Sequence, residues 1–420
     1  MYKFVIKGGK KLSGNVVVSG AKNASLALMP ASLLSPGTFR IDNTPDLRDV
    51  TTMSQLMESL GAKVSLKGKL QVIDTTGVEK FEAPYELVKK MRASIYVLGP
   101  LLGRYGYAKV SMPGGCAWGP RPVNLHIEGM EKLGAEVTLD SGYIIARAKK
   151  LRGARINFDV SSVGATGNIM MAAVLAEGTT VISNAALEPE IVALGEFLEK
   201  MGAHIEGLGT PTVTIEGVED LSPADFENIP DRIEAGTFLV AGAMAGGRVK
   251  VSNCKPADLT SLLVKLEGAG AKLETGKDTI TIEAPGQIKP VDVSTAPYPG
   301  FPTDMQAQWI AFMALATGSS ILTETIYFDR FKHVPELVRL GADIEVKENI
   351  AIVKGVKSLK GAKVMSTDLR ASASLILAGL VAEGTTEVLR IYHMDRGYER
   401  MEEKLRGLGA DIERVQSDEF

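Results

Sequence analysis

The sequence predicts an α/β protein built from repeated copies of one unit. A tripeptide with glycine at its centre occurs six times, and its glycines are 73, 68, 68, 71 and 68 residues apart. Each copy ends an amphipathic, helix-like stretch, and β-branched alternation typical of a strand follows it. Such regular spacing indicates a repeat architecture. The tripeptides are Leu60-Gly61-Ala62, Leu133-Gly134-Ala135, Met201-Gly202-Ala203, Ala269-Gly270-Ala271, Leu340-Gly341-Ala342 and Leu408-Gly409-Ala410.

Within each copy the expected order is helix, strand, helix, strand, strand. The first helix is rich in Ala, Leu and Met, as in residues 169–178, which predicts that it is buried on all sides. The second helix, as in residues 50–60, has one apolar face. The closing strand and the turn after it are seen in residues 143–158.

The chain ends predict how the copies divide into domains. The sixth copy stops at Phe420 before its last strand, and residues 2–18 fit the missing piece. We therefore expect two domains of three copies each. Residues 20–229 form one, and residues 1–19 with 230–420 form the other, completed by the N-terminal strand. The chain would cross between them near residues 20–22 and 229–232, and ligands favour such interfaces.

Bulk composition bounds the class of protein. At 420 residues the chain exceeds the size at which one core stops growing, so several domains are expected. With 45% hydrophobic residues, 23% charged residues and a net charge of -3, nothing favours nucleic acid or an anionic membrane as partner. The N-terminus lacks the apolar segment of a secretory signal, and the apolar runs are too short to span a membrane. We expect a cytoplasmic monomer with free cysteines.

Unusual polar residues recur where helices are expected to begin. Cations there oppose the helix dipole, so arginines at equivalent places favour binding of a doubly charged anion such as a phosphate ester. Any one of them could instead be a solvated surface arginine. Asp304 could be an ordinary acidic residue of a first helical turn, or a base that reaches substrate. The first helices begin at Lys22-Asn23, Arg92, Ser162 to Gly164, Arg232, Asp304 and Arg370, and the second at Asp49, Arg121, Glu190, Asp258, Arg330 and Arg396.

One of the two cysteines lies in an insertion on the repeat. From glycine turn to tripeptide glycine, copy two has 28 residues, whereas copies one, three, five and six have 23 to 25. The extra residues fall within 113–120 and include Cys116. Insertions in repeats often have functions, and the glycine pair allows a mobile lid. The alternative is an inert surface thiol. Cys254, in a strand-like stretch, is expected to be structural.

Several common cofactor motifs are absent. The sequence has no Gly-x-Gly-x-x-Gly after a strand, no Walker lysine loop and no Cys-x-x-Cys or His-Glu-x-x-His spacing. Nicotinamide, P-loop nucleotide and zinc functions therefore lack support. His126 and His333 each follow an arginine, and a positioning or structural role is expected for both. We expect no metal and no organic cofactor.

Seven separated motifs resemble the MurA-type enolpyruvyl transferases, which are UDP-N-acetylglucosamine 1-carboxyvinyltransferases. The motifs are SGAKNASL around Lys22, PGGCAWGPRPVNLH around Cys116, SVGAT at residues 162–166, FPTDMQAQ around Asp304, RFKHVPEL after Arg330, TDLRASASL around Arg370 and DRGYER around Arg396. The resemblance implies an inside-out α/β barrel, with two domains of three βαβαββ-type units closing on substrate. It implies transfer of enolpyruvate from phosphoenolpyruvate to the 3-hydroxyl of UDP-N-acetylglucosamine, the first committed step of peptidoglycan synthesis, and sensitivity to fosfomycin.

The resemblance also implies residue roles. Cys116 matches the acid that protonates the methylene carbon, and Asp304 matches the base for the sugar hydroxyl. Lys22, Asn23, Arg121 and Arg396 match the phosphoenolpyruvate-binding set, in which Lys22 and Arg396 are also catalytic. Asp49, Arg330 and Arg370 would support the anionic site. The nucleotide-sugar positions are Arg92, Arg121, Pro122, Val123, Asn124, Leu125, Ser161, Ser162, Val163, Gly164, Asp304 and Ile326.

Two departures and two alternatives accompany this interpretation. Val160 stands where a lysine near the uridine would be expected, and Trp118 is an unusual residue for the loop. The sibling 5-enolpyruvylshikimate-3-phosphate synthases share the six-unit architecture, but their sequences do not have this cysteine loop. A non-catalytic nucleotide-sugar sensor would need the arginines but neither Cys116 nor Asp304.

Overall fold

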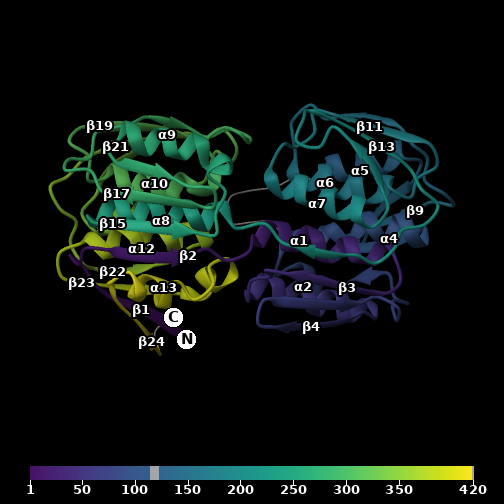
Figure 1. Cartoon of the computed structure of the whole chain (residues 1–420), viewed down its shortest axis with the longest axis horizontal. Helices are drawn as coiled ribbons and strands as arrows, with labels where there is room; N and C mark the ends of the chain where they lie inside the picture. Colours follow the sequence, from purple (N-terminus) through teal and green to yellow (C-terminus); the bar gives the residue numbers. More distant parts are fainter. Residues whose placement is uncertain (114–122, 419–420) are drawn as a thin grey trace. The chain divides into compact units, whose positions relative to one another are not determined.

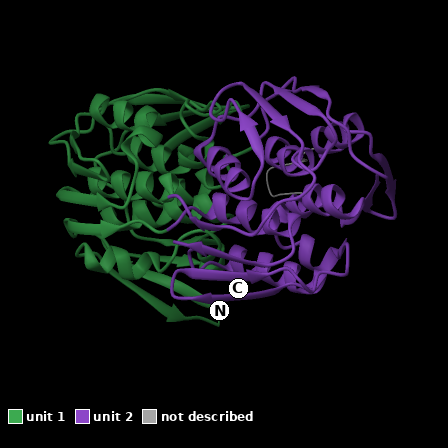
Figure 2. Ribbon diagram, turned by 45° about the vertical axis from the view of Figure 1, so that its right-hand side comes forward, with its two compact units in different colours: residues 1–19, 117–119, 230–420 green, residues 20–116, 120–229 purple. Residues whose placement is uncertain are grey.

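A computed structural model of the chain describes residues 1–113 and 123–418. The described chain is mixed α/β and divides into two compact units (Figure 2). Of the described residues, the N-terminal unit contains 20–113 and 123–229, and the C-terminal unit contains 1–19 and 230–418. Each unit has its own hydrophobic core. Cys116, Trp118, Arg121 and Pro122 lie outside the described residues, and so does the lid expected around them.

The described part of the N-terminal unit forms three sheets of four strands. Their orders are β14-β3-β5-β4, β6-β7-β9-β8 and β10-β11-β13-β12. In each sheet the first two strands in this order are parallel and the other neighbours are antiparallel. The strands are β3 (Thr38–Asp42), β4 (Lys63–Lys67), β5 (Leu70–Asp74), β6 (Glu82–Ala83), β7 (Tyr107–Ser111), β8 (Glu136–Asp140), β9 (Tyr143–Arg147), β10 (Arg155–Asn157), β11 (Thr179–Ser183), β12 (His204–Glu206), β13 (Thr212–Glu216) and β14 (Asp225–Glu227).

The helices of this unit are of two kinds. The helices α1 (Lys22–Ala31) and α6 (Val163–Ala173) are buried along most of their length, as their Ala, Leu and Met content predicts. The helices α2 (Arg48–Leu60), α5 (Asn124–Lys132) and α7 (Pro189–Lys200) each have an exposed side. The shorter elements are η1 (Ser32–Leu34), α3 (Tyr85–Val88), η2 (Arg92–Val97) and α4 (Leu98–Tyr105).

The C-terminal unit also contains three described sheets of four strands. Their orders are β22-β23-β1-β24, β16-β17-β15-β2 and β18-β19-β21-β20. The N-terminal strand β1 lies between β23 and β24 and is antiparallel to both. The strands are β1 (Tyr2–Lys7), β2 (Ser13–Val17), β15 (Arg248–Ser252), β16 (Lys272–Thr275), β17 (Thr279–Glu283), β18 (Val293–Ser294), β19 (Ser319–Thr323), β20 (Asp343–Lys347), β21 (Ile350–Lys354), β22 (Lys363–Met365), β23 (Thr385–Leu389) and β24 (Asp411–Gln416).

Three buried helices pack against one another in this unit: α8 (Arg232–Ala245), α10 (Gln306–Met313) and α12 (Leu369–Val381) (Figure 1). All eight residues of α10 are buried. Because these helices are surrounded by protein, they need apolar or small residues all round. The remaining elements are η3 (Pro256–Leu259), α9 (Thr260–Gly268), η4 (Thr303–Met305), α11 (Val334–Arg339), η5 (Ile391–Arg396) and α13 (Met401–Gly407).

The central glycine of each repeated tripeptide adopts a left-handed conformation. The φ angles of all six lie between 92° and 110°. In the first copy, α2 ends at Leu60, and the N–H of Gly61 bonds the carbonyl oxygen of Glu58 at 3.0 Å. A side chain at this φ would be strained, so glycine is the residue that lets the helix stop and the strand begin.

Besides the sheet that contains β1, two described sheets include a strand from a distant part of the chain. In the N-terminal unit β14 is parallel to β3, with Phe226 opposite Ile41. In the C-terminal unit β2 is parallel to β15, with Val16 opposite Val251. These long-range pairs tie the ends of each unit's chain segments into its sheets. No helix among the described residues is long and apolar enough to cross a bilayer.

Candidate active site

Asp304 is bound by two buried arginines in the C-terminal unit. The Oδ1 atom lies 2.9 Å from Nη1 of Arg330, and Oδ2 lies 2.9 Å from Nη2 of Arg370. The arginine side chains are 5% and 4% exposed, whereas that of Asp304 is 27% exposed. Each carboxylate oxygen thus has its own cation, while the group itself remains open to solvent on one side. Two cations therefore fix the orientation of this partly exposed carboxylate.

Arg330 is held in place by a buried polar group that the sequence analysis did not identify. Its Nη1 also donates to Oγ1 of Thr303 at 2.9 Å, and Thr303 donates to Oε2 of Glu324 at 2.8 Å. Glu324 is fully buried, and its Oε1 accepts a bond from the Ile326 N–H at 2.8 Å. Glu324 therefore joins the Arg330 side chain to the backbone at Ile326, one of the expected nucleotide-sugar positions.

Arg370 is oriented by the start of its own helix. Asp368 caps α12, and its Oδ1 accepts bonds from the backbone N–H of Arg370 at 2.8 Å and of Ala371 at 3.0 Å. Burial alone would lower the pKa of the Arg370 guanidinium, but the charge of Asp304, its hydrogen bond to Arg370 and other nearby acidic groups together outweigh burial and raise it. Arg370 consequently stays cationic and keeps its charge beside Asp304.

Lys22 and Asp49 come together in the N-terminal unit. Lys22 begins α1, Asp49 is in the first turn of α2, and Nζ lies 3.4 Å from Oδ2. Both side chains are largely buried, at 12% and 4% exposure. Asn23 follows on α1 and is exposed. Asp49 thus orients the lysine expected to bind phosphoenolpyruvate.

A buried histidine joins three of the segments expected to bind the nucleotide sugar. His126 of α5 lies 3.0 Å from the side-chain nitrogen of Asn168 on α6. The same amide nitrogen donates to the Ile95 carbonyl oxygen of η2 at 2.8 Å. Burial, helped by the charge of Arg92, lowers the pKa of His126 to about 4, so the ring is neutral at physiological pH. Because an amide nitrogen only donates, Nδ1 must accept, and the ring proton is on Nε2.

Several of the expected nucleotide-sugar positions lie on or next to the segments that this histidine joins. Ser162 caps α6 by accepting a bond from the Ala165 N–H at 3.3 Å. A Cβ at Gly164 would lie 3.2 Å from two atoms of the His126 ring, which favours glycine there. Arg92 begins η2, Val123 is the N-cap of α5, and Asn124 and Leu125 begin that helix. Ser161 and Val163 flank Ser162, and Val160 is exposed.

The expectation that Arg330 and Arg396 begin second helices is wrong. Arg330 lies in a turn before α11, which begins at Val334. Arg396 is the last residue of η5, and α13 begins only at Met401. The cause in the sixth copy is a left-handed residue, Arg400, which interrupts the helical path directly before α13.

Two other features of the described chain lie apart from these groups. Cys254 is buried, and burial together with the charge of Asp278 raises the pKa of its thiol to about 11, so little of it is thiolate at neutral pH. No cluster of metal-ligating side chains occurs within residues 1–113 and 123–418.

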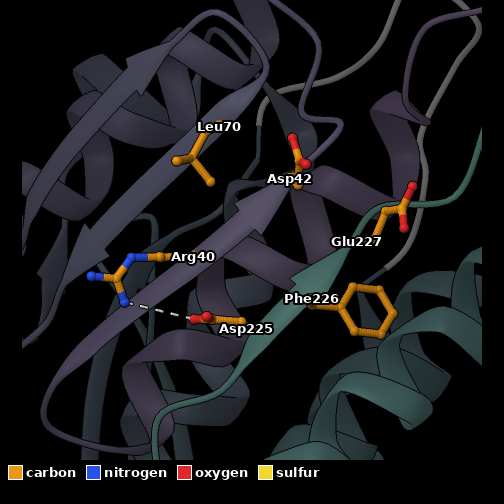
Figure 3. A pocket seen from close by; sticks show the side chains of 6 residues that line it. All are labelled: Arg40, Asp42, Leu70, Asp225, Phe226 and Glu227. Atoms are coloured by element: carbon orange, nitrogen blue, oxygen red, sulfur yellow. Dashed lines mark ion pairs between the residues drawn. The ribbon is translucent and has the colours of Figure 1, made fainter.

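A shallow hollow on the β14-β3-β5-β4 sheet includes none of the expected site residues (Figure 3). It is lined by Arg40, Asp42, Leu70, Asp225, Phe226 and Glu227.

Comparisons with known proteins agree with the arrangement of charged side chains described above. The model of the EPSP synthase (3-phosphoshikimate 1-carboxyvinyltransferase) family matches residues 6–405. The UDP-N-acetylglucosamine 1-carboxyvinyltransferase of Chloroherpeton thalassium is 60% identical, over 100% of this chain and 99% of the relative. The chain belongs to this enolpyruvyl transferase family. A second member, from Geotalea daltonii, is 56% identical over 99% of this chain and 100% of its own.

Solved structures show the enolpyruvyl transferase fold. The enolpyruvyl transferase NikO from Streptomyces tendae has a TM-score of 0.90 and 27% identity, with 99% of each chain covered. An EPSP synthase from Acinetobacter baumannii has a TM-score of 0.74 at 20% identity, covering 99% of this chain and 100% of its own. The fold is thus common to enolpyruvyl transferases that differ widely in sequence.

Proposed function

We propose that the protein transfers enolpyruvate from phosphoenolpyruvate to the 3-hydroxyl of UDP-N-acetylglucosamine and releases phosphate. The observation that supports this most strongly is the 56–60% identity, over essentially the full chain, to relatives named UDP-N-acetylglucosamine 1-carboxyvinyltransferase. The arrangement of Asp304 between Arg330 and Arg370 agrees with it, because the reaction needs an ionised base that stays in one orientation. The products would serve peptidoglycan synthesis, and hence cell-wall biogenesis, cell shape and division.

In the proposed addition, the Asp304 carboxylate takes the proton of the sugar 3-hydroxyl. The hydroxyl oxygen then forms a bond to C2 of phosphoenolpyruvate, while C3 takes a proton from the Cys116 thiol. In the elimination, C3 returns a proton to the Cys116 thiolate, the C2–O bond to phosphate breaks, and the double bond forms again. The leaving phosphate takes the proton that Asp304 holds, which restores the carboxylate. The net products are the enolpyruvyl ether and inorganic phosphate, with no oxidant, reductant or metal needed.

Charged residues supply the remaining contacts in this proposal. Lys22, Asn23, Arg121 and Arg396 bind the phosphate and carboxylate of phosphoenolpyruvate, because a trianionic substrate needs several cations. Asp49 orients Lys22 through the 3.4 Å contact. The nucleotide sugar contacts the segments around His126 and the backbone at Ile326. Family membership supports these roles.

Architecture and location are proposed on the same basis. We infer an inside-out α/β barrel in each unit, with three βαβαββ-type copies around central helices. Residues 20–229 include the Cys116 loop as a lid, and the N-terminal strand completes the sixth copy. We also infer a cytoplasmic monomer that needs no cofactor, with phosphoenolpyruvate and UDP-N-acetylglucosamine as its small-molecule partners.

A phosphate-release assay with two acceptors tests the function. Phosphoenolpyruvate with UDP-N-acetylglucosamine should release phosphate, whereas phosphoenolpyruvate with shikimate 3-phosphate should not. Release only with shikimate 3-phosphate would favour the sibling activity. Binding of the nucleotide sugar without any release would instead favour a sensor.

Fosfomycin should inactivate the protein by alkylating Cys116. The buried Cys254 thiol, with its pKa raised to about 11, should stay unmodified. Peptide mass spectrometry locates the label, and Cys254→Ala provides the matched control, which should be inactivated at the wild-type rate. Labelling of Cys254 alone would contradict the role of the loop.

A further inference from the structure

A buried layer of neutral polar side chains lies beneath the Asp304–Arg370 ion pair. It consists of Thr237 on α8, Gln308 on α10 and Tyr398, which follows η5. Thr237 and Gln308 are fully buried, and Tyr398 is 2% exposed. Polar side chains are costly at the contact of three helices unless they bond one another. Their presence in this helix core therefore needs a reason beyond packing.

The direction of each hydrogen bond in this layer follows from proton counting. The Thr237 hydroxyl donates to the Ile233 carbonyl oxygen at 2.8 Å, which uses its only proton. Thr237 Oγ1 must therefore accept from the Tyr398 hydroxyl at 2.8 Å. Nε2 of Gln308, which has two protons to donate, lies 3.1 Å from Thr237 Oγ1. Burial raises the pKa of Tyr398, although Arg370 opposes the rise, so the phenol keeps its proton at neutral pH.

The layer contacts both members of the ion pair. The Arg370 guanidinium carbon lies 5.3 Å from the centre of the Tyr398 ring. Gln308 Nε2 lies 3.2 Å from the Tyr398 hydroxyl and 3.0 Å from the main-chain oxygen of Asp304. The Tyr398 ring thus supports the Arg370 cation. The Tyr398 hydroxyl, acting through Gln308, supports the backbone of Asp304.

We propose that Tyr398 is a positioning residue for the transfer: its ring and hydroxyl, acting with Thr237 and Gln308, fix how the Asp304 carboxylate meets the Arg370 guanidinium. This inference rests on the proposed function, because it assumes that Asp304 is the base. When a reaction depends on a base that accepts a proton along one direction, its rate falls if the orientation of the base becomes less fixed, even if substrate still binds. Tyr398 would therefore affect kcat more than KM.

The test compares Tyr398→Phe with wild type. Phenylalanine keeps the ring beneath Arg370 and removes only the hydroxyl, so kcat should fall about tenfold while KM for UDP-N-acetylglucosamine changes less than about twofold. The acidic limb of the kcat–pH profile should move to higher pH, since a carboxylate with a looser cationic partner takes up a proton more readily. Tyr105→Phe is the matched control, because it also removes a buried tyrosine hydroxyl, but in the N-terminal unit instead of the C-terminal unit. It should leave kcat and the profile unchanged.

A double-mutant cycle adds a second, independent variant. Thr237→Val removes the acceptor of the Tyr398 proton, so it should lower kcat by a similar factor, and the double variant should lose little more. Three results would each overturn the inference. They are a wild-type kcat in Tyr398→Phe, a loss of kcat in the double variant equal to the product of the two single losses, and a loss of kcat that only matches the loss of folded protein. If wild type itself releases no phosphate from phosphoenolpyruvate with UDP-N-acetylglucosamine, the proposed function fails instead.

Discussion

Replacement of Asp304 by alanine should abolish turnover. Removing a general base costs about 10²- to 10⁴-fold in rate, and Asp304 is the carboxylate that contacts both Arg330 and Arg370. The measurement is steady-state phosphate release with phosphoenolpyruvate and UDP-N-acetylglucosamine. Circular dichroism should show the wild-type fold.

Asp304→Asn separates loss of the base from loss of structure. The alanine variant leaves two buried guanidinium groups without their shared partner, and this costs stability. Asparagine keeps the volume and a hydrogen-bond acceptor between the arginines but cannot take the hydroxyl proton. Turnover should therefore be lost in both variants, and Asp304→Asn should destabilise the protein less than Asp304→Ala does. Normal turnover in either one would remove the base role.

Replacement of Lys404 by methionine should destabilise the C-terminal unit strongly. Glu234 is 3% exposed, and its Oε1 lies 2.5 Å from Nζ of Lys404, while its Oε2 accepts the Ser19 N–H at 2.8 Å. Methionine would leave a buried carboxylate without its cation, which costs about 3–5 kcal/mol. The measurement is the free energy of unfolding in urea. Lys272→Met, which breaks an exposed pair with Glu283, is the control and should cost at most about 1 kcal/mol.

The cost of Lys404→Met should depend on pH. Burial raises the pKa of Glu234 above its ordinary value of 4.5, and Lys404 opposes that rise. Without Lys404 the folded protein holds the proton to still higher pH than the unfolded chain does. Folding stability is then lost as the pH rises from the pKa of Glu234 in the unfolded chain through its pKa in the folded protein. The difference from wild type should therefore be larger near pH 8 than near pH 5.5, and an equal difference at both would contradict the buried-charge explanation.

The class of fold could be predicted because its signals are local in sequence. The glycine of each tripeptide stops a helix wherever it occurs, and Gly61 and its counterparts adopt the left-handed conformation that this requires. The apolar composition of α10 indicates burial without knowledge of its neighbours. The enolpyruvyl transferase fold followed from motifs, and the solved structures confirm it.

Pairings between distant segments could not be predicted from such signals. Nothing near β14 in the sequence indicates that it lies beside β3. Asp304, Arg330 and Arg370 were each noticed, but whether two arginines share one carboxylate depends on which helices are adjacent. Glu324 was missed because a single carboxylate after a strand looks like a surface residue until its burial is known.

The buried polar layer was missed for a related reason. Gln308 and Tyr398 are both within motifs used for the resemblance, in MQAQ and DRGYER. A polar residue inside a helix-like stretch is ordinarily solvated, so its type alone does not reveal a partner. Only the positions of α8, α10 and the segment after η5 show that these side chains bond one another.

The most direct test of the central claim follows the bridging oxygen of phosphoenolpyruvate. With a heavy oxygen isotope between C2 and phosphorus, addition and elimination at C2 should transfer all of the label to inorganic phosphate. The sugar product should be unlabelled, with an enolpyruvyl group on its 3-oxygen by mass spectrometry and NMR. Label retained on the three-carbon fragment, or a product that is phosphorylated rather than enolpyruvylated, would contradict enolpyruvyl transfer.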